Sequence, residues 1–144
     1  MRLPTYAASV ALSICLLSGC SQQAAATDDL IHALSESHSA ISSSILGIGL
    51  YEQGRSTRAA TETLLGDMAS QLADAQRAVE PVAIDSVQLQ TDRDAALAAI
   101  DAGVTALLTS RDDLEQHGVV GNTAALQSAG HEVDIVLDEL RGSR

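Results

Sequence analysis

Residues 97–114 have the sequence LAAIDAGVTALLTSRDDL, in which apolar side chains recur three and four positions apart. The repeat consists of Leu97, Ile100, Val104, Leu107, Arg111 and Leu114. This spacing places the side chains on one face of an α-helix, as in the seam of a coiled coil. The stretch therefore predicts a helix over about residues 91–117 with one buried face.

Three other segments carry the same 3–4 spacing. In the first of them the repeat consists of Ile31, Leu34, His38, Ile41, Ile45 and Ile48. Thr27 is its expected N-cap, because the acidic residues that follow suit the positive end of a helix dipole. Gly54 and Pro81 are expected to end the first and second helices. The predicted helices cover about residues 28–52, 57–80, 91–117 and 123–141.

The stretch from Pro81 to Leu89 is ambiguous, because its apolar residues nearly alternate with other residues. No second strand is available to pair with it, so we expect a loop whose helix cap is Asp85 or Thr91. Four amphipathic helices joined by short links predict an all-α fold, an antiparallel up-down four-helix bundle. A three-helix variant, in which one end helix docks poorly, is the alternative.

The N-terminus has a different character. Arg2 precedes an apolar run from Tyr6 to Leu17, and Leu17-Ser18-Gly19-Cys20 follows as a possible cleavage site. The run is too short for a spanning helix, which needs about 20 apolar residues. The arrangement resembles the signal peptide of bacterial lipoproteins, which ends in a lipobox. An ordinary signal peptide that happens to contain Cys20 is the alternative.

The resemblance implies that the chain is cut before Cys20 and that Cys20 carries acyl chains, such as palmitate, on a diacylglyceryl group. Residues 1–19 would then be the removed signal peptide, 20–26 a lipidated tether and 27–144 the helical bundle domain. It places the protein on the extracytoplasmic face of the cell membrane, held through Cys20. Fully extended, the tether would reach at most about 25 Å.

Composition excludes several classes of function. The chain has nineteen acidic residues and eight basic ones, all of them Arg, and without residues 1–19 its net charge is −12 because Arg2 is lost. Such a surface repels nucleic acid and anionic headgroups. Apart from Cys20, the mature part has no cysteine, which excludes disulfides and thiolate sites. Tyr51 is its only aromatic residue, so base-stacking or sugar-stacking surfaces are not expected.

Few residues suggest chemistry. His38 in the first repeat is interpreted as a half-buried histidine bonded to a serine or a backbone carbonyl; a ligand or a pH-sensitive group is the alternative. The run from Ser35 to Ser44 has neither a nucleophile elbow nor a His–Asp pairing. Arg111 is expected to pair with Glu52, the alternative being an anion site. We therefore predict no enzyme activity.

Metal binding is not expected either. The pairs Asp28–His32 and Asp113–His117 have i, i+4 spacing, but both lie near helix ends, where such pairs cap and solvate. The Glu-x-x-His motif of di-iron bundles is absent from the sequence. No metal and no other cofactor is therefore predicted.

The segment LYEQGRSTRAA at residues 50–60, which leads into Leu64 and Leu65, is loosely similar to small helical lipoproteins of GC-rich actinobacteria. That resemblance implies no activity. Tyr51, Arg55 and Arg58 are nevertheless the predicted contact surface, because Tyr and Arg are enriched in interface hot spots. The expected function is a non-catalytic module that binds an envelope protein. A carrier that holds a small apolar ligand between its helices is the alternative.

Overall fold

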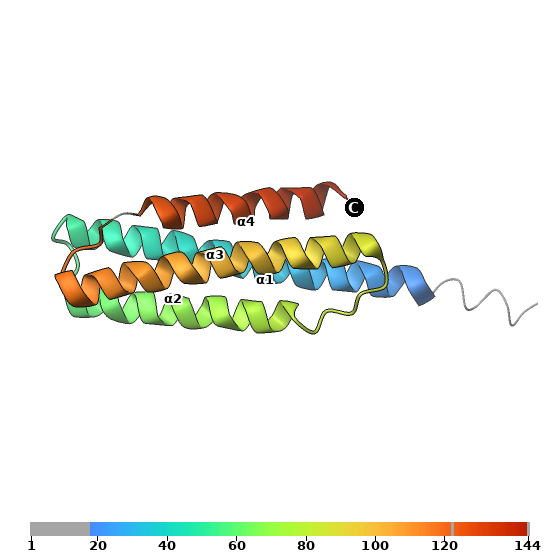
Figure 1. Ribbon diagram of the computed structural model, residues 1–144, viewed down its shortest axis with the longest axis horizontal. Coiled ribbons are helices and arrows are strands. Elements are labelled where there is room, and N and C mark those ends of the chain that lie inside the picture. Colours follow the sequence, from blue (N-terminus) through green and yellow to red (C-terminus); the bar gives the residue numbers. More distant parts are fainter. Residues whose placement is uncertain (1–17, 122, 144) are drawn as a thin grey trace, which may run out of the picture.

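The computed structural model describes residues 18–121 and 123–143, with side chains from residue 23 onward. Residues 1–17, most of the predicted signal peptide, Asn122 and Arg144 lie outside the described residues. The helices are α1 (Ser18–Glu52), α2 (Arg58–Val79), α3 (Val87–His117) and α4 (Ala124–Gly142). They lie side by side and alternate in direction, and each packs against its neighbours (Figure 1). The predicted all-α bundle is confirmed in its four-helix form, because α4 contacts both α1 and α3.

The bundle has two ends, to which we give fixed names. The N-terminal end consists of the start of α1, the loop of residues 80–86 and the end of α4, and the far end consists of the α1–α2 and α3–α4 turns (Figure 1). Because α1 and α3 run in the same direction, both of them finish at the far end.

The start of α1 differs from the prediction. α1 is helical from Ser18, so the predicted tether of residues 20–26 is wrong. Thr27 is an interior residue of the helix, where its Oγ1 donates to the carbonyl of Gln23 at 3.1 Å, and not an N-cap. Three alanines and two glutamines in this segment are good helix formers, and Ala26 is already buried against the bundle. The helix therefore continues where a flexible link was expected.

The buried face of α1 is shifted from the predicted seam. Its fully buried row consists of Leu30, Leu34, Ser37, Ile41, Ser44 and Ile48. This row has the same 3–4 spacing as the predicted one and shares every second member with it. Ser37 and Ser44 replace His38 and Ile45 at the centre, and each hydroxyl donates to the carbonyl four residues back at 2.8 Å. The hydroxyls are thereby satisfied without a partner from another helix.

Small residues let α1 and α3 approach across the diagonal of the bundle. These two helices contact each other, whereas α2 and α4 do not. Gly103 of α3 is buried, and a Cβ placed on it would lie 2.9 Å from Cδ1 of Ile41. Ser110 is also buried on α3, and its hydroxyl donates to the carbonyl of Ala106. The cross-section is therefore flattened, with α2 and α4 on its outer corners.

Helix ends follow local chemistry. Gly54 and Gly118 have φ of 69°, a left-handed conformation that glycine adopts without strain, at the ends of α1 and α3. Thr57 caps α2, its Oγ1 accepting from the amide of Ala60 at 3.2 Å. α3 begins at Val87 with Ser86 as its cap, so the predicted caps at residues 85 and 91 were wrong. The expected loop is confirmed over residues 81–86, whereas residues 87–89 belong to α3 and residue 80, expected in α2, belongs to the loop.

Candidate functional site

At the far end, two of the three predicted contact residues tie the helices together. Tyr51 is half-buried, and its hydroxyl donates to the carbonyl of Gly118 at 2.5 Å. Arg58 NH2 donates to the carbonyl of Glu115. The last carbonyls of a helix lack partners within that helix, and a cation there also complements the helix dipole. Tyr51 and Arg58 thus satisfy two backbone carbonyls at the C-terminal end of α3.

The Arg58 guanidinium is held on both sides. Its Nε donates to Oε1 of Glu62 at 2.6 Å, one turn further along α2. The hydrogen bond to the Glu62 carboxylate raises the pKa of Arg58. The arginine therefore stays charged and keeps a fixed position between the start of α2 and the end of α3.

Arg55 is placed differently from its two neighbours. It lies in the turn between α1 and α2, and its side chain is exposed. Within the described part of the chain, its guanidinium has no hydrogen bond or ion pair, and only its backbone amide is bonded, to the carbonyl of Leu50. The far end therefore presents one exposed arginine on a turn that Tyr51 and Arg58 hold rigid.

The two polar residues of the predicted seams both lie at the edge of the core. Arg111 donates from Nε to Oε1 of Glu115 at 2.8 Å, so the predicted pair with Glu52 is wrong. Glu115 lies one turn further along the same helix, within direct reach of the guanidinium. The neighbouring Ser110 occupies the buried position instead.

His38 has a partner that the sequence did not indicate. Its Nε2 lies 3.3 Å from Oδ1 of Asp134 on α4, and both side chains are about half exposed. A pair this exposed contributes little stability. The predicted serine or carbonyl partner is wrong, and so is the expected lack of a His–Asp pairing. Asp134 could have been found by aligning the sequences of α1 and α4 in opposite directions, which places residues of the middle of α4 beside His38.

The serines do not join His38 in a hydrolytic arrangement. Among the described residues of the serine-rich run, Ser35, Ser37 and Ser44 donate to carbonyls of their own helix. No described serine hydroxyl lies within hydrogen-bond distance of the His38 ring. A nucleophile and a general base are therefore not in contact in this part of the molecule.

Of the two predicted ligand pairs, one is present as an ion pair. His32 pairs with Glu36 at 3.4 Å, whereas the candidate partner was Asp28. His117 does face Asp113, at 3.9 Å, on the exposed end of α3. Among the described residues, no group of three His, Cys, Asp or Glu side chains is arranged to hold a metal ion.

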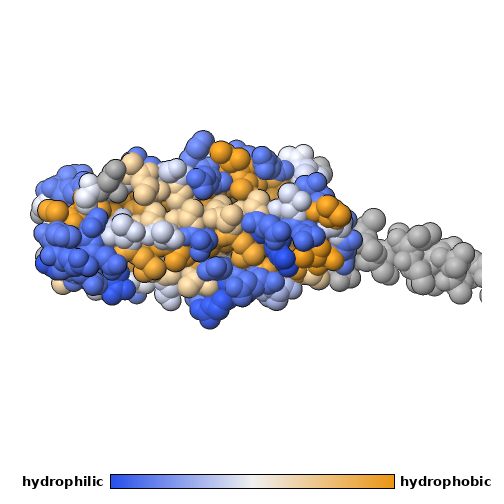
Figure 2. All heavy atoms as spheres, viewed as in Figure 1, coloured by the Kyte–Doolittle hydropathy of each residue, from blue (hydrophilic) through white to orange (hydrophobic). Residues whose placement is uncertain are grey.

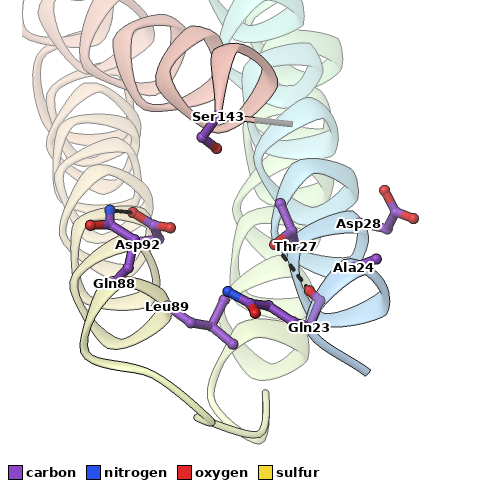
Figure 3. Close-up of a pocket in the computed structure, with 8 residues that line it drawn as sticks. All are labelled: Gln23, Ala24, Thr27, Asp28, Gln88, Leu89, Asp92 and Ser143. Carbon is purple, nitrogen blue, oxygen red and sulfur yellow. Dashed lines mark hydrogen bonds between the residues drawn. The ribbon is translucent and has the colours of Figure 1, made fainter. Parts of the chain in front are cut away.

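The surface of the bundle is hollowed at both its N-terminal end and its flank. The first hollow, of about 490 Å³, lies at the N-terminal end, between Gln23 and Thr27 of α1 and Gln88 and Asp92 of α3 (Figure 3). Leu89 and Gln23 point toward each other across its floor, and Ser143 lies at the end of α4 above it (Figure 3). Gln88 and Asp92 are bonded to each other at 2.8 Å on its α3 wall. Its lining combines amides, hydroxyls and carboxylates with few large apolar groups.

Two further hollows are lined in large part by alanines. A groove of about 400 Å³ runs between α3 and α4, along a face where apolar residues gather (Figure 2). The second hollow, of about 230 Å³, lies at the N-terminal end between α1 and the loop of residues 80–86. Asp29 is its only polar lining residue; the others are Ala25, Ala26, Ala78, Pro81, Val82 and Ala83. All three hollows lie at the surface, while the large side chains between the helices are fully buried.

The chain was compared with protein families, curated proteins and solved structures. No protein-family model, curated protein or solved structure matches this chain. Within the described residues, none of the helices is long and apolar enough to cross a membrane.

Proposed function

We propose that the chain is a membrane-anchored lipoprotein whose bundle binds another protein of the cell envelope through its far end. Signal cleavage before Cys20 and acylation of Cys20 would hold it on the extracytoplasmic face. The observation that carries the proposal is the far-end turn, where Arg55 is exposed between two residues already locked in place. The backbone of this turn is already held, so presenting an arginine from it costs little backbone freedom on binding, and arginine is common among interface anchors.

The topology supports this assignment. Cys20 lies in the first turn of α1, and Tyr51 lies in its last turn. At a rise of 1.5 Å per residue, the two positions are about 47 Å apart along the helix. A protein held at Cys20 would therefore present the far end well beyond the headgroups, where a partner protein can reach it.

Charge indicates what the partner offers. The mature chain has seven arginines against nineteen acidic residues, and two of the arginines lie at the start of α2 and the turn before it. Arg58 is neutralised within the molecule by Glu62, which leaves Arg55 as the cation available there. The complementary group on the partner is a carboxylate, since Arg and carboxylate form short bidentate pairs.

Two measurements in the native host test the proposal. Mass spectrometry of the membrane fraction should find a chain that begins at Cys20 and carries a diacylglyceryl group, and Cys20→Ala should release the protein from the membrane. A photocrosslinking residue at position 55 should capture one discrete partner, and the same residue at position 77 should not. Arg77 is the matched control, because it is an exposed arginine at the other end of α2.

Each result has its counterpart. An unmodified chain in the soluble fraction would refute the anchor. Equal capture at positions 55 and 77, or none at either, would refute the far end as the contact surface. Arg55→Ala should leave the amount of folded protein unchanged, because the side chain is exposed and has no hydrogen bond or ion pair among the described residues.

A further inference from the structure

Two large apolar side chains are exposed at the N-terminal end, one of them largely and one in part. Val87, the first residue of α3, is 82 % exposed, the highest value among the large apolar side chains of the described residues, and Ile84 is 38 % exposed. The cap of α3 is made by Ser86, so the helix start does not require valine at position 87. Val82 and Leu89, on either side, are buried and hold the segment against the core.

Two further exposed residues without charge lie in the same loop. Pro81 and Ala83 are exposed in the same loop and border the hollow of about 230 Å³ against α1. We call Pro81, Ala83, Ile84 and Val87 the loop surface. The loop of residues 80–86 contains no basic residue, and its charged members are Glu80 and Asp85. An anionic binding partner is therefore disfavoured, and an apolar one is favoured.

The start of α1 brings this surface close to the proposed anchor. The backbone is helical without interruption from Ser18, and Ala26 is buried against the bundle. Position 20 is therefore about 9 Å along the helix from Ala26, where an extended tether would have allowed about 25 Å. Ala25 and Ala26 line the same hollow as Pro81 and Ala83. A membrane that holds Cys20 would consequently lie within reach of the loop surface.

We propose that the loop surface is a second membrane contact, in which Ile84 and Val87 enter the interfacial region of the bilayer that holds Cys20. This inference rests on the proposed lipid anchor. A single lipid site fixes the depth of a protein but leaves its tilt free, and a second apolar contact beside it restrains the tilt. The bundle then stands upright, with its far end directed away from the membrane. The bilayer contact is apolar, and electrostatic attraction to anionic lipid plays no part in it.

Fluorescence on the lipidated protein, reconstituted in phosphatidylcholine vesicles, tests the contact. Single cysteines at positions 84, 87 and 119 would be labelled with an environment-sensitive dye, since acylated Cys20 does not react. Val119 is the matched control, an apolar residue 59 % exposed in the turn at the far end. Dyes at 84 and 87 should shift to the blue and be quenched by spin-labelled lipid, whereas the dye at 119 should show neither effect.

Tilt provides a second readout. Energy transfer from a donor at position 119 to acceptors in the bilayer should be weak for the upright protein and should rise in the variant Ile84→Asn with Val87→Asn. Leu108→Asn is the control, since Leu108 is partly exposed on the flank of α3. Far-ultraviolet circular dichroism confirms that all variants fold.

Three outcomes would overturn the inference. The dye at 87 could remain as unquenched as the dye at 119. Energy transfer could be the same in the double variant and the control. A concentration-dependent blue shift in the unlipidated Cys20→Ala protein without vesicles would assign the surface to a second copy of the chain. Failure of the anchor itself is distinct, because the protein would then carry no diacylglyceryl mass and would not float with the vesicles at all.

Discussion

The close approach of α1 and α3 leads to a prediction that can be worked out atom by atom. A Cβ on Gly103 would lie 2.9 Å from Cδ1 of Ile41, closer than non-bonded carbons approach, and 3.7 Å from Cδ1 of Leu72. Gly103→Ala gains about 1 kcal/mol of helix propensity and loses about 1–3 kcal/mol through overpacking. The net change in the free energy of unfolding should lie between about zero and a loss of 2 kcal/mol.

Two further variants isolate the steric part. Gly66→Ala is the matched control, because nothing lies within 4 Å of the added methyl group on α2. It should stabilise the protein by about 1 kcal/mol. Ile41→Val removes the Cδ1 atom that the new methyl group meets, and it should cost about 1 kcal/mol alone. In the double variant the two changes should compensate, with a coupling energy of about 1–3 kcal/mol.

Urea unfolding of the chain from Ser21 onward, followed by circular dichroism at the helix band, measures all four variants against the parent. The linear extrapolation gives each free energy, and equal slopes confirm that the unfolded state is unchanged. If Gly103→Ala stabilises the protein as much as Gly66→Ala does, and the coupling to Ile41→Val is zero, the small residues are not what sets the α1–α3 distance. The account of the flattened cross-section would then be refuted.

Three other outcomes are expected. Tyr51→Phe should lower the free energy of unfolding by about 1 kcal/mol, since it removes the hydrogen bond to the carbonyl of Gly118; an unchanged value would mean that this bond does not hold the far end. Ser86→Ala should cost about 1 kcal/mol, because Oγ of Ser86 caps α3 by accepting from the amide of Leu89. Thr91→Ala should stay within about 0.5 kcal/mol in the same urea assay, and the reverse order would move the cap to position 91. A native mass spectrum of the protein from its own host should show the bare polypeptide beside its lipid, and any further mass would favour the apolar-ligand carrier.

The sequence alone determined the number of helices, their approximate bounds and their alternation. The helices can be recognised without tertiary information, because the spacing of three and four positions between apolar residues follows from the 3.6-residue period of the helix. The ends of the helices also depend on local residue type: Gly54 and Gly118 adopt positive φ, and Pro81 follows the end of α2. The contact residues at the far end were selected by residue type, and two of them do meet α3.

Helix register was decided only by the tertiary structure. In α1 and α3, the predicted seams contained His38 and Arg111, and in both helices the neighbouring serine is the buried residue. Two rows of identical spacing overlap on the same helix, and pattern alone does not separate them. Ser37 and Ser110 can occupy the buried positions because they are small and satisfy their hydroxyls within their own helix.

The same holds for the ends of the elements and for the pairs between helices. The first residues of α1 have helix-forming composition, but the burial of Ala26 against the bundle supports a helix there over an extended link. The pair of His38 with Asp134 and the bond from Arg58 to the carbonyl of Glu115 join positions far apart in the chain. Such contacts depend on how the four helices are arranged, which periodicity on each separate helix does not encode.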